Sequence, residues 1–297
     1  MKLLVTHTFP VDAEPLRIYD YCTGLFKELP SRKSVKKAIE RGQIRLNGEA
    51  TETGFWLNGG ETIELYDLED TPPKEYRLKL EVLYEDEDLA VIVKPAGLLT
   101  SGNSFKTVTN ALSYNLSPST SVDKLNWAKP VHRLDKATSG ILLIAKSRSA
   151  HMKLTQQFEK NQVKKTYHAL VLGKMSGDGV MDTPIDQKEA TTHYTVVRSI
   201  PSIRSGHLSL VQLHPKTGRR HQLRIHLSTL GHAILGDSIY SPKELYLKHK
   251  GLFLAATAIS FRHPIQENPM NFSIPIPSKM QNRLKYEEKR WNRANLE

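Results

Sequence analysis

The sequence predicts an α+β protein of two domains, and three observations support this. At 297 residues, the chain is longer than one average domain. Short runs that alternate polar and apolar residues, as strands do, occur beside runs with helical spacing. A polar segment with the adjacent prolines Pro72 and Pro73 separates a small N-terminal part from the rest. We expect a small α+β domain over residues 1–66, a linker over 67–80 and a larger domain over 81–297.

In the N-terminal part, a basic helix is followed by a hairpin. Val35, Ala38 and Ile39 are spaced to form the apolar face of a short helix, which Gly42 ends. The next residues, 43–48, alternate in polarity and close on Asn-Gly, a strong hairpin-turn signal. The cations that we expect to contact a ligand are Arg32, Lys36, Arg41 and Arg45.

This helix and hairpin resemble the alpha-L RNA-binding module of a small-subunit ribosomal protein, over about residues 14–65. The resemblance implies that the four cations hold structured RNA through its phosphates, an attraction that depends on salt and little on sequence. A solvated basic helix without a partner is the alternative.

Further along the chain, the elements of the larger domain follow in order. Residues 81–93 read as two strands around an acidic turn, and 94–97 form the exit turn. Residues 98–131 are rich in Ser, Thr and Asn and predict no element. A helix is expected over 149–160 and a strand over 165–172. The basic stretch 279–293 has the composition of either a helix that adds to an RNA surface or a solvated tail.

The most informative segment is His132–Gly140, with the sequence His-Arg-Leu-Asp-Lys-Ala-Thr-Ser-Gly. It places Asp135 in a polar turn between Arg133 and Lys136, just before an apolar run that predicts a buried strand over 141–145. A carboxylate beside fixed positive charge stays ionised near neutral pH and can act as a nucleophile or electrostatic stabiliser. For an isolated Asp, a pair with Arg133 or a turn cap is the commoner role.

The segment resembles the signature His-Arg-Leu-Asp-x-x-Thr-Ser-Gly of the RluA-type pseudouridine synthases. The resemblance implies a mixed, largely antiparallel sheet in an α+β catalytic domain, and isomerisation of uridine in ribosomal or transfer RNA without cofactor or metal. Asp135 would act at the bond between ribose and uracil, while Arg133 would fill the space that the extruded uridine leaves. We also expect His132 to contact the substrate.

Two further segments resemble the same family. Residues 165–171 match the segment whose tyrosine, here Tyr167, stacks on the target base and takes part in proton transfer. On an ordinary strand such a tyrosine would more often be core. Residues 217–227 match the segment whose arginine, here Arg224, pairs with the catalytic aspartate, and whose aliphatic neighbour, Leu223, lines the pocket. Leu223, Leu227 and Leu230 are expected to mark one helix face.

The larger domain also contains two departures from the family pattern and a group of histidines. Arg220 replaces the usual threonine, and residues 100–102 replace a His-Pro pair. We expect neither to touch the proposed chemistry, and an altered RNA contact is the role open to both. His214, His221 and His226 lack the spacing and the glutamate of a zinc helix, so no metal site is expected.

The composition agrees with an RNA partner. The net charge is +11 and the pI is about 9.5, which favours association with a polyanion. No apolar run approaches the roughly 20 residues that span a bilayer, and the first ten residues do not form a signal peptide. We therefore expect a cytoplasmic monomer without a membrane partner. Cys22 is the only cysteine and is expected to be packed.

Two other functional classes compete with an isomerase. A non-catalytic RNA-binding or ribosome-assembly protein would lack the pocket residues, but Asp135, Tyr167 and Arg224 are all present. A glycosidase usually needs two carboxylates and a nuclease needs metal-binding acids, whereas one carboxylate lies in these motifs.

Overall fold

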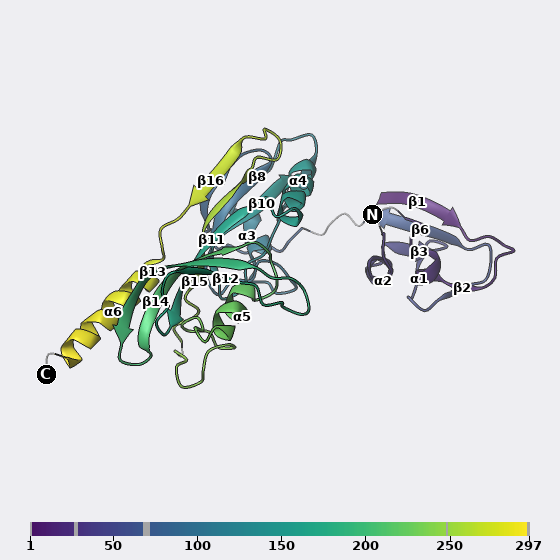
Figure 1. Cartoon of the computed structure of the whole chain (residues 1–297). Helices are drawn as coiled ribbons and strands as arrows, with labels where there is room; N and C mark the ends of the chain where they lie inside the picture. The colour runs from purple at the N-terminus through teal and green to yellow at the C-terminus, as the bar shows by residue number, and fades with distance from the viewer. Residues whose placement is uncertain (1, 27–28, 68–71, 248, 296–297) are drawn as a thin grey trace. The chain divides into compact units, whose positions relative to one another are not determined.

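The computed structural model describes residues 2–26, 29–67, 72–247 and 249–295 (Figure 1). The chain divides into two compact units, Met1–Pro72 and Pro73–Glu297, called here the N-terminal unit and the larger unit. The division lies inside the segment 67–80 that we predicted to be a linker, of which residues 68–71 lie outside the described part.

The N-terminal unit contains the predicted helix and hairpin. Helix α2 (Arg32–Glu40) starts at Ser31, whose side chain accepts a hydrogen bond from the Ser34 amide in a capping box. Strands β3 (Ile44–Leu46) and β4 (Glu49–Ala50) form the hairpin. Its turn needs left-handed backbone at two consecutive residues, which Asn47 and Gly48 supply with φ values of 50° and 84°.

The hairpin extends a small antiparallel sheet of order β1-β6-β3-β4. The flanking strands and helix are β1 (Lys2–Thr8), β6 (Thr62–Asp67), α1 (Ile18–Tyr21) and the short pair β2 (Leu16–Arg17) and β5 (Trp56–Leu57). The apolar face of α2 packs into the core of this unit, where Cys22 is fully buried as predicted.

The larger unit is built on a ten-stranded sheet among its described residues. Its strands are β7 (Glu81–Glu85), β8 (Leu89–Lys94), β9 (Lys124–Pro130), β10 (Ser139–Ser147), β11 (Lys164–Leu172), β12 (Asp178–Met181), β13 (Thr192–Ser202), β14 (Gly206–Pro215), β15 (Leu254–Arg262) and β16 (Pro269–Ser273). The main order is β12-β13-β14-β11-β15-β10-β8-β7, with β16 beside β15 and β9 beside β10. Only β10 and β15 pair in parallel among the described strands, so the predicted mixed, largely antiparallel α+β fold is confirmed.

Four helices of the larger unit are described: α3 (Val108–Asn115), α4 (Arg148–Glu159), α5 (Gln222–Thr229) and α6 (Ser278–Ala294). Helix α4 and strand β11 confirm the elements predicted over 149–160 and 165–172, and α6 shows that the basic C-terminal stretch is helical. The segment 98–131, for which no element was predicted, contains α3 and β9. Helix α4 packs beside β10 and α6 beside β13 (Figure 1).

Strand β10 is the central element that positions the site. Its residues from Gly140 to Ser147 are buried, which confirms the strand predicted over 141–145. Gly140 has a φ of +121° and lies against the backbone of Ala256 on β15, where a Cβ atom would come within 2.1 Å of a carbonyl oxygen. Glycine therefore ends the 132–140 segment because two parallel strands meet there with no space for a side chain.

Candidate active site

Asp135 lies in the loop between β9 and β10, and Thr100 holds one side of this loop. The Thr100 hydroxyl donates to the Leu134 carbonyl at 3.0 Å and accepts from the Leu134 amide at 3.2 Å. Both groups are buried. Thr100 does not line the pocket, but its hydroxyl ties down the backbone next to Asp135.

Lys94 holds the other side of the loop. Its ammonium is fully buried and donates to the carbonyls of Pro95 at 3.0 Å, Leu98 at 2.8 Å and Lys136 at 3.4 Å. The Gly97 amide donates to the same Lys136 carbonyl at 2.7 Å. Burial lowers the pKa of Lys94 to about 8, against the opposing effect of Asp135. The turn after β8 thus fixes the residues on both sides of Asp135.

Arg224 faces Asp135 but makes its hydrogen bonds to another carboxylate. It donates to Asp237 twice, from Nε and from Nη2, each at 2.7 Å, while its Nη1 is 3.9 Å from Asp135 Oδ2. Burial opposes the charged form of each partner, but the hydrogen bonds outweigh it, raising the pKa of Arg224 and lowering the pKa of Asp237. We did not predict a role for Asp237 from the sequence. It is buried, and it fixes Arg224 beside Asp135.

His221 is the second group near Asp135. Its Nε2 is 3.7 Å from Asp135 Oδ2, and its Nδ1 is 3.0 Å from the Tyr240 hydroxyl. The residue precedes α5 with a φ of 55°, in the left-handed region that is uncommon for residues other than glycine. Burial lowers the pKa of His221 against the opposing charge of Asp135, so the ring is neutral near pH 7.

Gln222 anchors the start of α5. Its Oε1 accepts from the Thr217 hydroxyl at 2.7 Å and from the Arg219 amide at 3.0 Å. Its Nε2 donates to the Thr191 carbonyl and the Thr192 hydroxyl, both at 3.0 Å. The side chain therefore uses all its polar groups to tie the turn 217–219 to β13.

Leu223 is buried on α5 and lines the pocket, and Leu227 is also buried. Leu230 lies just beyond the helix and is 47% exposed, so its predicted place on the buried face was wrong. Helical spacing cannot be extended past the last residue of the helix.

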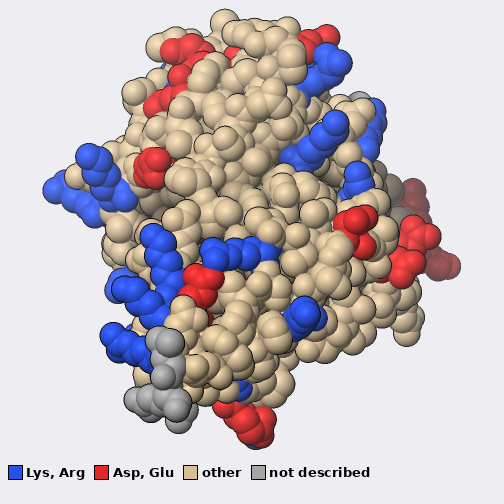
Figure 2. Space-filling view, turned by 60° about the vertical axis from the view of Figure 1, so that its left-hand side comes forward, with Lys and Arg blue, Asp and Glu red and all other residues tan. Residues whose placement is uncertain are grey.

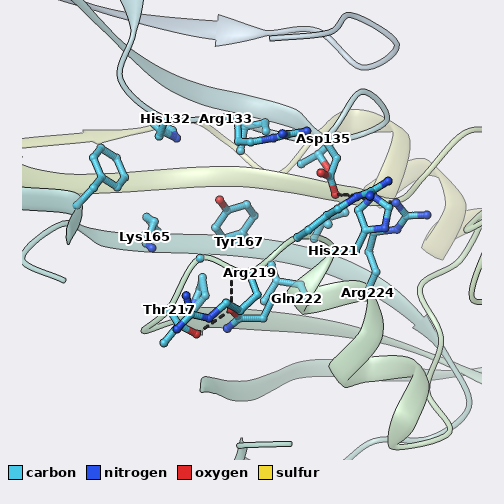
Figure 3. A pocket seen from close by; sticks show the side chains of 18 of the residues that line it. His132, Arg133, Asp135, Lys165, Tyr167, Thr217, Arg219, His221, Gln222 and Arg224 are labelled. Carbon is cyan, nitrogen blue, oxygen red and sulfur yellow. Dashed lines mark hydrogen bonds and ion pairs between the residues drawn. The ribbon is translucent and has the colours of Figure 1, made fainter. Parts of the chain in front are cut away.

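Tyr167 lies on β11 between two groups of polar side chains (Figure 3). Burial and the nearby charge of Asp135 both raise the pKa of Tyr167, so its hydroxyl stays protonated and is a hydrogen-bond donor. Its ring packs against two core clusters of the larger unit and forms part of the pocket wall.

His132 and Arg133 line the same pocket. His132 Nε2 accepts from the Leu143 amide at 3.0 Å, and the ring stacks on Phe158 with a centroid distance of 4.6 Å. Burial lowers the pKa of His132 to about 3, and the charge of Lys165 adds to the effect. The ring is therefore neutral and supports β10. Arg133 is exposed at the pocket.

Asp135, Tyr167 and Arg224 line one pocket with a volume of about 530 Å³, within the range of small-ligand sites. The structure thus brings together six of the residues predicted from the sequence. These are His132, Arg133, Asp135, Tyr167, Leu223 and Arg224. Arg220, the second departure from the family pattern, also lines the pocket.

The other predicted residues lie in the N-terminal unit. Arg32 is exposed and pairs with Asp20 at 2.8 Å, while the Lys36 ammonium lies over the Tyr19 ring at 4.8 Å from its centroid. Arg41 is exposed. The fourth, Arg45, lies partly buried over the Tyr66 ring.

Two further features concern metal binding and membrane crossing. No group of three His, Cys, Asp or Glu side chains among them could hold a metal ion. Among the described helices, none is both long and apolar enough to cross a membrane.

Comparison with known proteins places these features in a family. The family model described as RNA pseudouridylate synthase matches residues 88–229, a range that contains Asp135, Tyr167 and Arg224. A human structure titled RNA Pseudouridylate Synthase Domain Containing 4 is 25% identical, with a TM-score of 0.54, and the match covers 69% of this chain and 93% of that one.

Relatives match over most of the chain. An uncharacterized RNA pseudouridine synthase of Aquifex aeolicus is 33% identical over 93% of this chain and 95% of its own. The ribosomal large subunit pseudouridine synthase D of Vibrio cholerae is 33% identical over 84% of this chain and 85% of its own. This chain therefore belongs to the RNA pseudouridylate synthases and is an isomerase that converts uridine in RNA to pseudouridine.

Proposed function

We propose that Asp135 is the catalytic carboxylate and acts at the bond between ribose C1′ and uracil N1. The observation that carries this proposal is the position of Asp135: its carboxylate, on a loop fixed by Thr100 and Lys94, faces the pocket 3.9 Å from Arg224. A group held this firmly can meet a reacting atom at a defined position.

In this mechanism, Asp135 attacks C1′ or stabilises the positive charge that develops there as the bond to N1 breaks. The detached uracil then turns and C5 bonds to C1′, which breaks any bond between Asp135 and C1′. The proton on C5 leaves to solvent, and N1 takes up a proton from solvent. Arg224 keeps a positive charge beside the carboxylate, while Asp237 holds the arginine from behind. We propose Arg224 as the residue that orients Asp135 for this step.

Tyr167 would stack on the uracil and donate a hydrogen bond. Its raised pKa keeps the hydroxyl protonated until it meets the substrate. The uridine must leave its stack to enter the pocket, which costs a few kcal/mol. The exposed guanidinium of Arg133, at the pocket, is suited to occupy the vacated place.

We propose that the RNA is ribosomal, with Arg32, Lys36, Arg41 and Arg45 of an alpha-L-type domain as phosphate contacts. The name of the Vibrio cholerae relative and the net charge of +11 support this. Figure 2 shows further Lys and Arg side chains along the left side of one face, with few Asp and Glu among them. A cytoplasmic monomer without a membrane partner agrees with such a substrate.

Tritium release tests the proposal. RNA labelled at uridine C5 is incubated with the wild-type protein or with Asp135→Asn, which has nearly the same shape. We expect release by the wild type and a loss of at least about 10³-fold in the variant. Release by Asp135→Asn at the wild-type rate would contradict the role of Asp135. Release from transfer RNA but not from large-subunit RNA would overturn the proposed substrate.

A further inference from the structure

The pocket has a second side that the proposed chemistry does not use. Asp135, His221 and Arg224 lie on one side of Tyr167, and Lys165 lies on the other, with His132 above it (Figure 3). Because Lys165 and Tyr167 are two residues apart on β11, their side chains point to the same face of the sheet, about 7 Å apart along the strand.

Lys165 differs from the buried cations of the same unit. Arg224 is paired with Asp237, Lys146 with Glu85, and Lys94 with three backbone carbonyls. Each therefore has its partner within the protein, as a cation removed from water requires.

Lys165 has no such partner among the described residues. It is partly buried, yet its ammonium makes no hydrogen bond or ion pair with them, and it lies over the Phe158 ring at 5.9 Å from the centroid. Glu159 also lines this side but is exposed and makes no ion pair with Lys165. Burial lowers the pKa of Lys165, as expected for an ammonium with which no carboxylate of the described residues pairs.

We propose that Lys165 binds a backbone phosphate of the RNA, on the 5′ or 3′ side of the target uridine. This inference rests on the proposed function, which places the ribose at Asp135 and the base on Tyr167. The RNA strand must continue from that ribose through a phosphate in each direction. A phosphate supplies the negative charge that the site lacks, and a flexible ammonium is a common phosphate ligand. The contact would hold the extruded nucleotide in register with Asp135.

The test pairs a protein change with an RNA change. The substrate is a stem-loop RNA containing the uridine that the wild-type enzyme modifies, made with natural phosphates or with one neutral methylphosphonate beside that uridine. Lys165→Gln is compared with Lys164→Gln, which removes the same charge from the neighbouring, exposed residue on the opposite face of β11. Lys165→Arg keeps the charge, and melting curves check that each variant is folded.

We expect Lys165→Gln to raise KM and lower kcat/KM about tenfold on natural RNA, with a smaller loss for Lys165→Arg. One of the two methylphosphonates should lower kcat/KM by a similar factor for the wild type and Lys164→Gln. It should not lower kcat/KM further for Lys165→Gln, because the contact is already absent. If each methylphosphonate lowers kcat/KM by the same factor in the wild type and in Lys165→Gln, the inference is overturned. Because wild-type turnover on natural RNA is measured in the same series, failure of the proposed function would appear separately.

Discussion

The cations of the N-terminal unit and those around the pocket are chemically alike but held differently. Lys36 lies on the surface of a short helix and Arg41 directly follows it, and water and salt screen both. Lys94 and Arg224 are buried, and each is fixed by two or more hydrogen bonds. Members of the first set can therefore be lost one at a time with small effects, whereas each member of the second set supports the position of Asp135.

The largest effect is expected from Asp237→Asn, which leaves Arg224 buried without its ionic partner. Breaking one side of a buried pair costs about 3–5 kcal/mol. The free energy of unfolding, measured with urea, should fall by this amount, and tritium release should fall with it as Arg224 moves relative to Asp135. The exposed Asp178→Asn is the control and should change stability by less than about 0.5 kcal/mol. An Asp237→Asn protein that unfolds at the wild-type urea concentration would show that the pair is not structural.

A smaller effect is expected from Thr100→Val, which keeps the shape of the side chain but removes both hydrogen bonds to Leu134. The unpaired backbone groups should cost about 1–3 kcal/mol of stability. Because the loop carries Asp135, we expect kcat to fall more than KM changes, as measured by steady-state tritium release. Thr100→Ser keeps the hydroxyl and should restore most of kcat. If Ser and Val behave alike at this position, the hydroxyl does not position the loop.

The smallest effects are expected from Lys36→Gln and Arg41→Gln in the N-terminal unit. Each exposed cation contributes one phosphate contact at most, so each change should weaken RNA binding by less than about tenfold at low salt and leave kcat unchanged. A plot of log affinity against log salt should become shallower by about 0.7–0.9 per contact removed. The same change at the exposed Lys243 of the larger unit is the control. A salt dependence that both N-terminal variants leave unchanged would exclude this helix from RNA binding.

The sequence by itself determined the elements whose signals are local. The apolar run of β10, the helical spacing of α4 and the alternation of β11 lie within single segments, and each predicted the element that the structure contains. The resemblance of three segments to one family indicated Asp135, Tyr167 and Arg224 before their convergence in one pocket was visible. Helix α3 and strand β9 escaped prediction because their Ser-, Thr- and Asn-rich segment has no clear period.

The tertiary structure alone decided how the pocket is supported. Thr100 is 34 residues from Leu134 in sequence, and Arg224 is 13 residues from Asp237. No local period links such pairs, because the sheet and the start of α5 bring them together only on folding. That Lys165 has no partner within the described part of the chain is likewise a property of its surroundings rather than of its segment, since the same strand carries an exposed lysine one residue earlier. Burial and partnership depend on contacts between distant segments, whereas periodicity and turn chemistry do not.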